Sequence, residues 1–65
     1  MKRISKFIRG ARVTSVEQLT SLLGRGCWVF LNHKAYHPAF IGRMGLMSLS
    51  RYVEAGRIEQ AIRRV

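Results

Sequence analysis

Residues 27–41 have the sequence CWVFLNHKAYHPAFI, and we expect the rest of the fold to be arranged around this segment. The segment opens on a continuous apolar run of strand length that is rich in β-branched and aromatic side chains. Asn32-His33 follows, and Asn tolerates the positive φ angles that a two-residue hairpin turn requires. The next residues, KAY, form a short return strand, which ends before Pro38 because proline cannot donate to a strand ladder. Since proline suits the first turn of a helix, the segment predicts a β-hairpin that leads into a helix.

A helix is predicted on the N-terminal side of this hairpin. The sequence TSVE at 14–17 matches a capping box, in which the threonine hydroxyl reaches forward and the glutamate reaches back to unpaired backbone amides. Gly24 and Gly26 then end the helix, because glycine accepts the left-handed cap conformation. One face is apolar and should pack against the hairpin. Its residues are Val16, Leu19, Leu22 and Leu23.

Two or three short helices are predicted after the hairpin, the first over 38–44 and the second over 48–55. Residues 57–65 are ambiguous, because four apolar positions fit a helical stripe while Ile58 and Ile62 fit one face of a strand that could join the hairpin. We favour the helix, which matches more positions. The side chains expected to face inward are Ala39, Phe40 and Ile41 in the first helix, and Leu46, Leu49, Tyr52 and Val53 in the second.

At 65 residues the chain forms one domain at most. We predict an α+β fold, with a helix, a β-hairpin and then two or three short helices within residues 13–65. Residues 1–12 form a basic N-terminal arm or helix, in which cations alternate with apolar residues at helical spacing. An arm that orders on its partner and an ordinary first helix or strand both fit this pattern. So short a chain buries little apolar surface, and a partner or homo-oligomer would add stability.

The charge of the chain is its strongest global property. Twelve Lys and Arg residues face three Glu, which gives a formal net charge of +9. Most of the cations are Arg, whose planar fork suits phosphate and carboxylate. The partner should therefore carry dense negative charge, as nucleic acid, an acidic protein surface or an anionic membrane surface does. The candidate binding residues are Lys2, Arg3, Lys6, Arg9, Arg12, Arg25, Lys34, Arg43, Arg51, Arg57, Arg63 and Arg64, with Tyr36 and Tyr52 as candidate aromatic contacts.

No catalytic or metal site can be assembled from the sequence. His33 and His37 have the spacing of half a zinc finger, but Cys27 is the only cysteine and the ligand set is incomplete. A Cys-His nucleophile would lack an acidic residue to orient the histidine. We therefore expect a binding protein that is not an enzyme and needs no cofactor.

Trp28 and Phe30 would point to the same face of the hairpin. A stacking platform for unpaired bases is one interpretation of this pair. We favour the other interpretation, in which both fill the core, because so small a domain has few large residues with which to build one. Trp28 is then expected between the hairpin and the helix that carries Val16 and Leu23.

The location of the protein can also be predicted. No stretch approaches the roughly 18 apolar residues of a transmembrane helix, and the basic N-terminus lacks the apolar core of a signal peptide. A single unpaired cysteine fits a reducing compartment, so we expect a cytoplasmic protein.

Two stretches, ISKFIRGARVTSVEQLTSLL at 4–23 and GCWVFLNHKAYHPAFIGRMGLMSLSRYVEAGRI at 26–58, resemble the small basic accessory proteins encoded by tailed bacteriophages and prophages. The resemblance is to a style of protein, and it assigns no functional residue. It implies a cytoplasmic, non-enzymatic protein that regulates or disables a host machine. We therefore predict a nucleic-acid-binding regulatory protein. The alternative is an inhibitor that docks on an acidic surface of a host protein.

Overall fold

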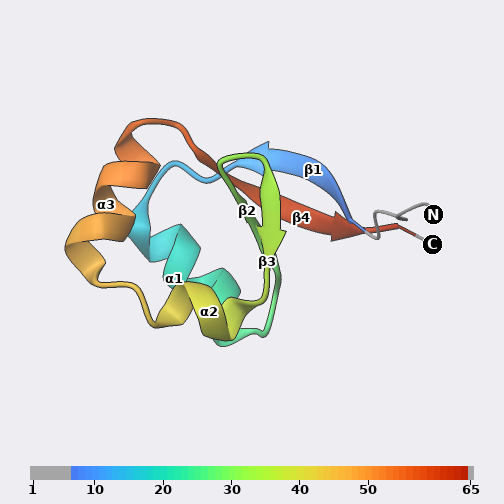
Figure 1. Ribbon diagram of the computed structural model, residues 1–65, viewed down its shortest axis with the longest axis horizontal. Coiled ribbons are helices and arrows are strands. Elements are labelled where there is room, and N and C mark those ends of the chain that lie inside the picture. Colours follow the sequence, from blue (N-terminus) through green and yellow to red (C-terminus); the bar gives the residue numbers. More distant parts are fainter. Residues whose placement is uncertain (1–6, 65) are drawn as a thin grey trace.

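The predicted α+β class is confirmed by the computed structural model, which describes residues 7–64. Four strands form one antiparallel sheet in the order β1-β4-β2-β3, and three helices lie together at one end of the molecule (Figure 1). No helix in this part of the chain is long and apolar enough to cross a membrane. The elements are β1 (Phe7–Arg12), α1 (Val16–Gly24), β2 (Val29–Leu31), β3 (Lys34–Tyr36), α2 (Pro38–Gly42), α3 (Leu46–Glu54) and β4 (Ile58–Arg63).

The predicted hairpin is confirmed. Strands β2 and β3 pair antiparallel, with Leu31 opposite Lys34 on either side of the turn. Asn32 has φ 53° and His33 has φ 73°, so both turn residues are left-handed, as a two-residue turn that follows the sheet twist requires. The helix after it begins at Pro38, and the Nδ1 atom of His37 accepts a hydrogen bond from the first turn of α2.

The helix favoured over residues 57–65 is wrong. Residues 58–63 form β4, which lies between β1 and β2 and pairs with both. The pattern over residues 1–12 fits an arm, a helix or a strand, and the described part, residues 7–12, forms the strand β1. Both segments carry apolar residues at spacings that suit a helix or a strand. Each segment forms a strand because it pairs with the other, about 50 residues away in the sequence. A local pattern of apolar residues does not reveal such a partner.

The core lies between the helices and one face of the sheet. It consists of Val13, Leu19, Val29, Leu31, Ile41, Leu49, Val53 and Ile58. Three inward predictions are wrong: Ala39 is exposed, Phe40 is 51% exposed and Leu46 is 65% exposed. Helix α2 has only five residues, so it can turn little more than Pro38 and Ile41 toward the core. Leu46 is the first residue of α3, whose buried residues are Leu49 and Val53.

Helix α1 follows the prediction except at its cap. Leu19 is buried, and Val16, Leu22 and Leu23 pack beside it, as the apolar stripe predicts. The N-cap is Ser15 and not Thr14, since the Ser15 Oγ atom accepts a hydrogen bond from the backbone amide of Gln18 at 3.1 Å. The capping sequence is therefore Ser-x-x-Gln, one residue later than predicted. The Gln18 side chain reaches back past the N-cap, and its Oε1 atom accepts a hydrogen bond from the Thr14 amide at 3.0 Å.

Two glycines allow a matched test of the backbone. Gly56 has φ +72°, and a Cβ atom there would lie 3.3 Å from the Arg12 guanidinium. Replacing Gly56 by alanine should lower the free energy of unfolding by about 1–2 kcal/mol. At Gly24, the last residue of α1, a Cβ atom would meet nothing within 4 Å. Gly24→Ala should therefore raise the same quantity by about 0.5–1 kcal/mol. Urea denaturation of both variants measures the two changes. A Gly56→Ala variant as stable as the unmodified chain, or a Gly24→Ala variant less stable than it, would contradict the prediction.

Candidate nucleic-acid interface

The helices pack on the face of the sheet that carries Val29, Leu31 and Ile58. The strand register places a different set of residues on the opposite face, because directly opposed residues and alternate residues along a strand share a face. Phe7 lies opposite Arg63, Arg9 opposite Ala61, and Phe30 opposite Glu59. We call this the outer face. Its residues are Phe7, Arg9, Trp28, Phe30, Glu59, Ala61 and Arg63.

The core position predicted for Trp28 is wrong. Its neighbours Val29 and Leu31 occupy the core face, so strand alternation turns Trp28 and Phe30 outward. They do share a face, as predicted. Phe30 is 8% exposed, so its burial is confirmed, although it does not belong to the cluster of buried residues around Leu19 and Ile58. Trp28 is half-buried, and its indole ring is accessible at the surface.

Aromatic rings gather around Trp28 on the outer face. Phe7 stacks on the indole with 4.7 Å between ring centroids, and His37 meets it edge-on at 5.4 Å. The guanidinium carbon of Arg63 lies 5.4 Å from the centre of the Phe7 ring, which is the geometry of a cation–π contact. A hollow of about 200 Å³ opens beside these rings. It is lined by Phe7, Gly26, Cys27, Trp28, Ala61 and Arg63.

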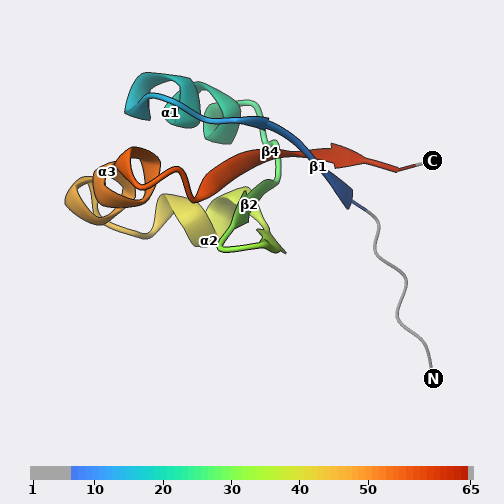
Figure 2. The same ribbon diagram turned by 90° about the horizontal axis from the view of Figure 1, so that it is seen from above.

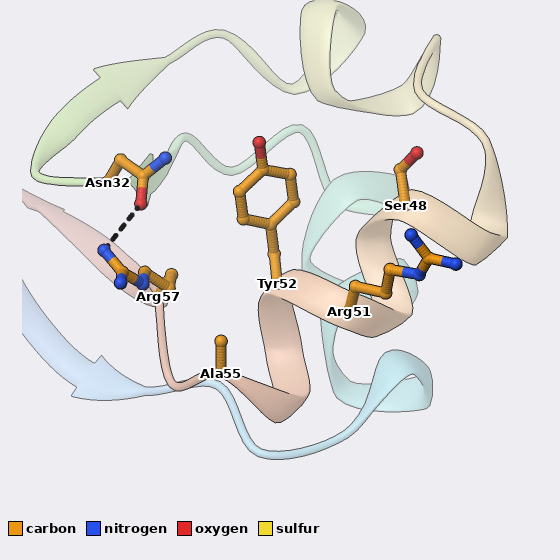
Figure 3. A pocket seen from close by; sticks show the side chains of 6 residues that line it. All are labelled: Asn32, Ser48, Arg51, Tyr52, Ala55 and Arg57. Atoms are coloured by element: carbon orange, nitrogen blue, oxygen red, sulfur yellow. Dashed lines mark hydrogen bonds between the residues drawn. The ribbon is translucent and has the colours of Figure 1, made fainter.

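A larger hollow of about 450 Å³ lies between α3 and the β2–β3 turn (Figure 3). We call it the basic pocket. Tyr52 stands between the guanidinium groups of Arg51 and Arg57 (Figure 3), and no carboxylate is among the lining residues. The pocket therefore offers hydrogen-bond donors on several sides. Its lining residues are Asn32, Ser48, Arg51, Tyr52, Ala55 and Arg57.

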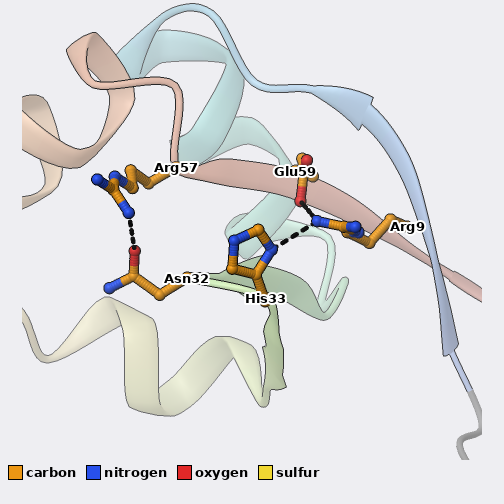
Figure 4. A network of polar contacts seen from close by, with 5 residues as sticks. All are labelled: Arg9, Asn32, His33, Arg57 and Glu59. Atoms are coloured by element: carbon orange, nitrogen blue, oxygen red, sulfur yellow. Dashed lines mark hydrogen bonds and ion pairs between the residues drawn. The ribbon is translucent and has the colours of Figure 1, made fainter.

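The β2–β3 turn connects the basic pocket to the outer face (Figure 4). On one side, the Asn32 amide donates to the Arg57 carbonyl oxygen at 3.1 Å, and the Arg57 Nη1 atom donates to Asn32 Oδ1 at 3.4 Å. On the other side, the Nη1 atom of Arg9 donates to His33 Nδ1 at 2.6 Å and lies 3.8 Å from Glu59 Oε1. Within residues 7–64 the Arg9–Glu59 contact is the one ion pair.

These contacts link the basic pocket to Arg9 on the outer face, and Arg63 lies on the same face. We call this set of residues the basic track. It runs from the basic pocket across the turn to the outer face. Its cations come from α3, from the residue before β4, from β1 and from the end of β4, so the fold collects charges that are far apart in sequence. The basic track consists of Arg51, Arg57, Asn32, His33, Arg9 and Arg63.

The structure separates the sequence-predicted cations into two groups. Arg9, Arg51, Arg57 and Arg63 belong to the basic track. The others that it describes lie elsewhere: Arg12 beside Gly56, Arg25 and Arg43 at the C-caps of α1 and α2, Lys34 at the start of β3 and Arg64 after β4. Lys2, Arg3 and Lys6 lie outside the described residues.

The two tyrosines also differ in their surroundings. Tyr52 lines the basic pocket, whereas Tyr36 stacks on Phe40 with 4.9 Å between ring centroids and packs against the core. Sequence reasoning did not include Phe7, Asn32 or Ser48 among the candidate residues. The parity of the hairpin strands was the available signal for an outward Trp28, but nothing local indicated the Phe7 ring that stacks on it.

No protein family, curated protein or solved structure was found to match the chain. A function for the chain therefore has to be inferred from the chemistry of the site itself. In the described residues no three His, Cys, Asp or Glu side chains come together as a metal site would require. What the site presents is guanidinium groups, hydroxyl and amide donors, and flat aromatic rings. That combination suits a ligand with several anionic groups and exposed ring faces.

Proposed function

We propose that this chain is a non-catalytic nucleic-acid-binding protein that acts through the basic track and has a regulatory role in the cytoplasm. The observation that carries the proposal is the link that the β2–β3 turn makes between two groups of cations. Arg51 and Arg57 line one hollow, Arg9 and Arg63 lie on the outer face, and the Asn32–His33 turn joins the two. A polyanion can contact all of these groups at once, whereas a single small anion would occupy only one of them.

The basic pocket has the chemistry of a phosphate-contact site. A guanidinium group matches two phosphate oxygens through parallel hydrogen bonds. The Arg57 backbone carbonyl accepts a hydrogen bond from the turn, and its guanidinium group donates one to Asn32 Oδ1. The second contact reduces the side-chain freedom that must be lost on binding. Ser48 and Tyr52 add hydroxyl donors to the same wall. Contacts of this kind position a nucleic acid without reading its sequence.

The test is the salt dependence of binding to duplex DNA, single-stranded DNA and RNA. If the four cations of the track each contact a phosphate of a single strand, the logarithm of the association constant should fall against the logarithm of salt concentration with a slope of about −3. Fluorescence anisotropy of labelled oligomers between about 50 and 200 mM salt measures this slope. Dissociation constants weaker than ~100 μM for all three ligands near physiological salt would refute the proposal.

The same experiment distinguishes the alternative function. An acidic protein surface would also satisfy guanidinium groups, and its binding would also weaken with salt. An inhibitor of a host protein, however, would bind one protein after nuclease treatment and would show no affinity for isolated nucleic acid. That combination of results would replace nucleic-acid binding by the inhibitor function.

A further inference from the structure

We infer that the hollow beside Trp28 takes an unpaired base, so that the preferred ligand is single-stranded nucleic acid. This inference rests on the proposed function and specifies its ligand. It concerns the aromatic residues of the outer face. These residues are separate from the basic pocket, where phosphate contacts are proposed.

Packing of the core does not explain why Trp28 lies where it does. The core beneath the helices is made of aliphatic side chains, and Trp28 is not part of it. A half-buried indole, a Phe ring and an Arg guanidinium meet instead at the surface. Aromatic rings and flat guanidinium groups are the side chains on which unstacked bases are held in single-strand-binding proteins.

The size of the hollow favours one flat group as its occupant. Its volume of about 200 Å³ is below the ~300–1,000 Å³ range of sites for drug-sized molecules. A base inside a duplex presents only its edge in a groove and keeps its faces stacked on its neighbours. Contact with ring faces therefore requires a base that has left the stack.

The charge around the hollow favours a nucleic acid over an uncharged aromatic ligand. Arg63 lies at the rim, against the Phe7 ring. Arg9 is two residues along β1 from Phe7 on the same face, which corresponds to about 6.6–6.8 Å of strand. A backbone that leaves the hollow in this direction meets Arg9 and then the remainder of the basic track. The same arrangement can hold a base and its following phosphates.

Trp28 makes the inference directly measurable, because it is the only tryptophan in the chain. The unmodified protein is titrated with an oligothymidine, with an abasic oligomer of equal length and charge, and with a duplex. We expect the oligothymidine to quench Trp28 fluorescence and to bind about 5- to 150-fold more tightly than the abasic oligomer. The abasic oligomer and the duplex should bind with little quenching. Equal affinity for the first two ligands, with unchanged Trp28 fluorescence, would overturn the stacking inference and leave the proposed function intact.

Variants supply a second measurement, with anisotropy of labelled oligomers as the readout. Trp28→Leu and Phe7→Leu should each remove most of the preference for oligothymidine and retain binding to the abasic oligomer. Phe40→Leu is the matched control, because Phe40 is an exposed aromatic outside the outer face. An equal loss of preference in the control would overturn the inference. If Trp28→Leu fails to fold by far-UV circular dichroism, the Phe7→Leu variant and the fluorescence of the unmodified chain decide the matter. Absence of binding to every oligomer would overturn both the inference and the proposed function.

Discussion

Replacing Ile58 by alanine is expected to lower the free energy of unfolding by about 2–5 kcal/mol, the usual cost of cutting a large core side chain to alanine. Ile58 is fully buried at 0% exposure, and it lies opposite Leu31 in the central strand of the sheet. Its carbonyl oxygen also accepts a 2.8 Å hydrogen bond from the Val13 amide, which joins the segment after β1 to β4. Because a core of this size supplies only about 3–5 kcal/mol, a loss near the upper end of the expected range should leave most of the variant unfolded at 25 °C.

Ile62→Ala is the control for this prediction, because Ile62 belongs to the same strand and is 48% exposed. It packs over Gly10 on the part of the β1–β4 ribbon that extends beyond the helices (Figure 2). Its loss should cost less than about 1 kcal/mol, since much of the side chain is in water in both states. Urea denaturation followed by far-UV circular dichroism measures both variants. Equal losses would mean that the core does not centre on Ile58.

The double replacement Arg51→Ala and Arg57→Ala is expected to weaken binding to all single-stranded sequences by about tenfold or more at low salt. Both guanidinium groups line the basic pocket, and each one that neutralises a phosphate releases a counterion from the strand. Removing two such contacts should make the salt slope shallower by about 1.4. The loss should therefore be largest near 50 mM salt and shrink toward about 200 mM. Fluorescence anisotropy at several salt concentrations gives the affinity and the slope together.

A matched double variant separates the basic track from the general charge of the chain. Arg25→Ala with Arg43→Ala removes the same charge from two exposed helix C-caps that line neither hollow. We expect a much smaller loss of affinity and a nearly unchanged slope, because only the distant field of the protein is altered. If the two double variants lost affinity equally, net charge would explain binding and the basic track would have no special role.

The parts of the fold that could be predicted are those that local sequence determines. The Asn32–His33 turn, the start of α2 at Pro38 and the apolar stripe of α1 each depend on a few neighbouring residues. The pairing of β4 with β1 and β2 depends on segments far apart in the chain, and the helix favoured over residues 57–65 was wrong.

In the candidate site, too, the features that local sequence determines could be predicted and those that depend on long-range pairing could not. The sequence showed that Arg51 and Arg57 are cations, but not that the β2–β3 turn would connect them to Arg9. Strand parity places Trp28 on the opposite face from Val29 and Leu31, but it does not say which face meets the helices. We favoured the core for Trp28 because large residues were scarce, yet the main buried cluster consists of aliphatic side chains. The stacking of Phe7 on Trp28 then required β1 and β4, which the local pattern did not reveal.

The position of β4 in the sheet has a consequence for the order of events during synthesis. Strands β1 and β2 are made first, yet they do not pair with each other, because β4 separates them. A nascent chain that ends before residue 58 therefore has an isolated strand and a short hairpin, and neither is stable alone in water. The ribosome adds residues from the N-terminus, so the long-range pairings form only when β4 emerges. Arg63 and Glu59 lie on β4. The basic track is therefore completed only when β4 pairs and the fold is complete.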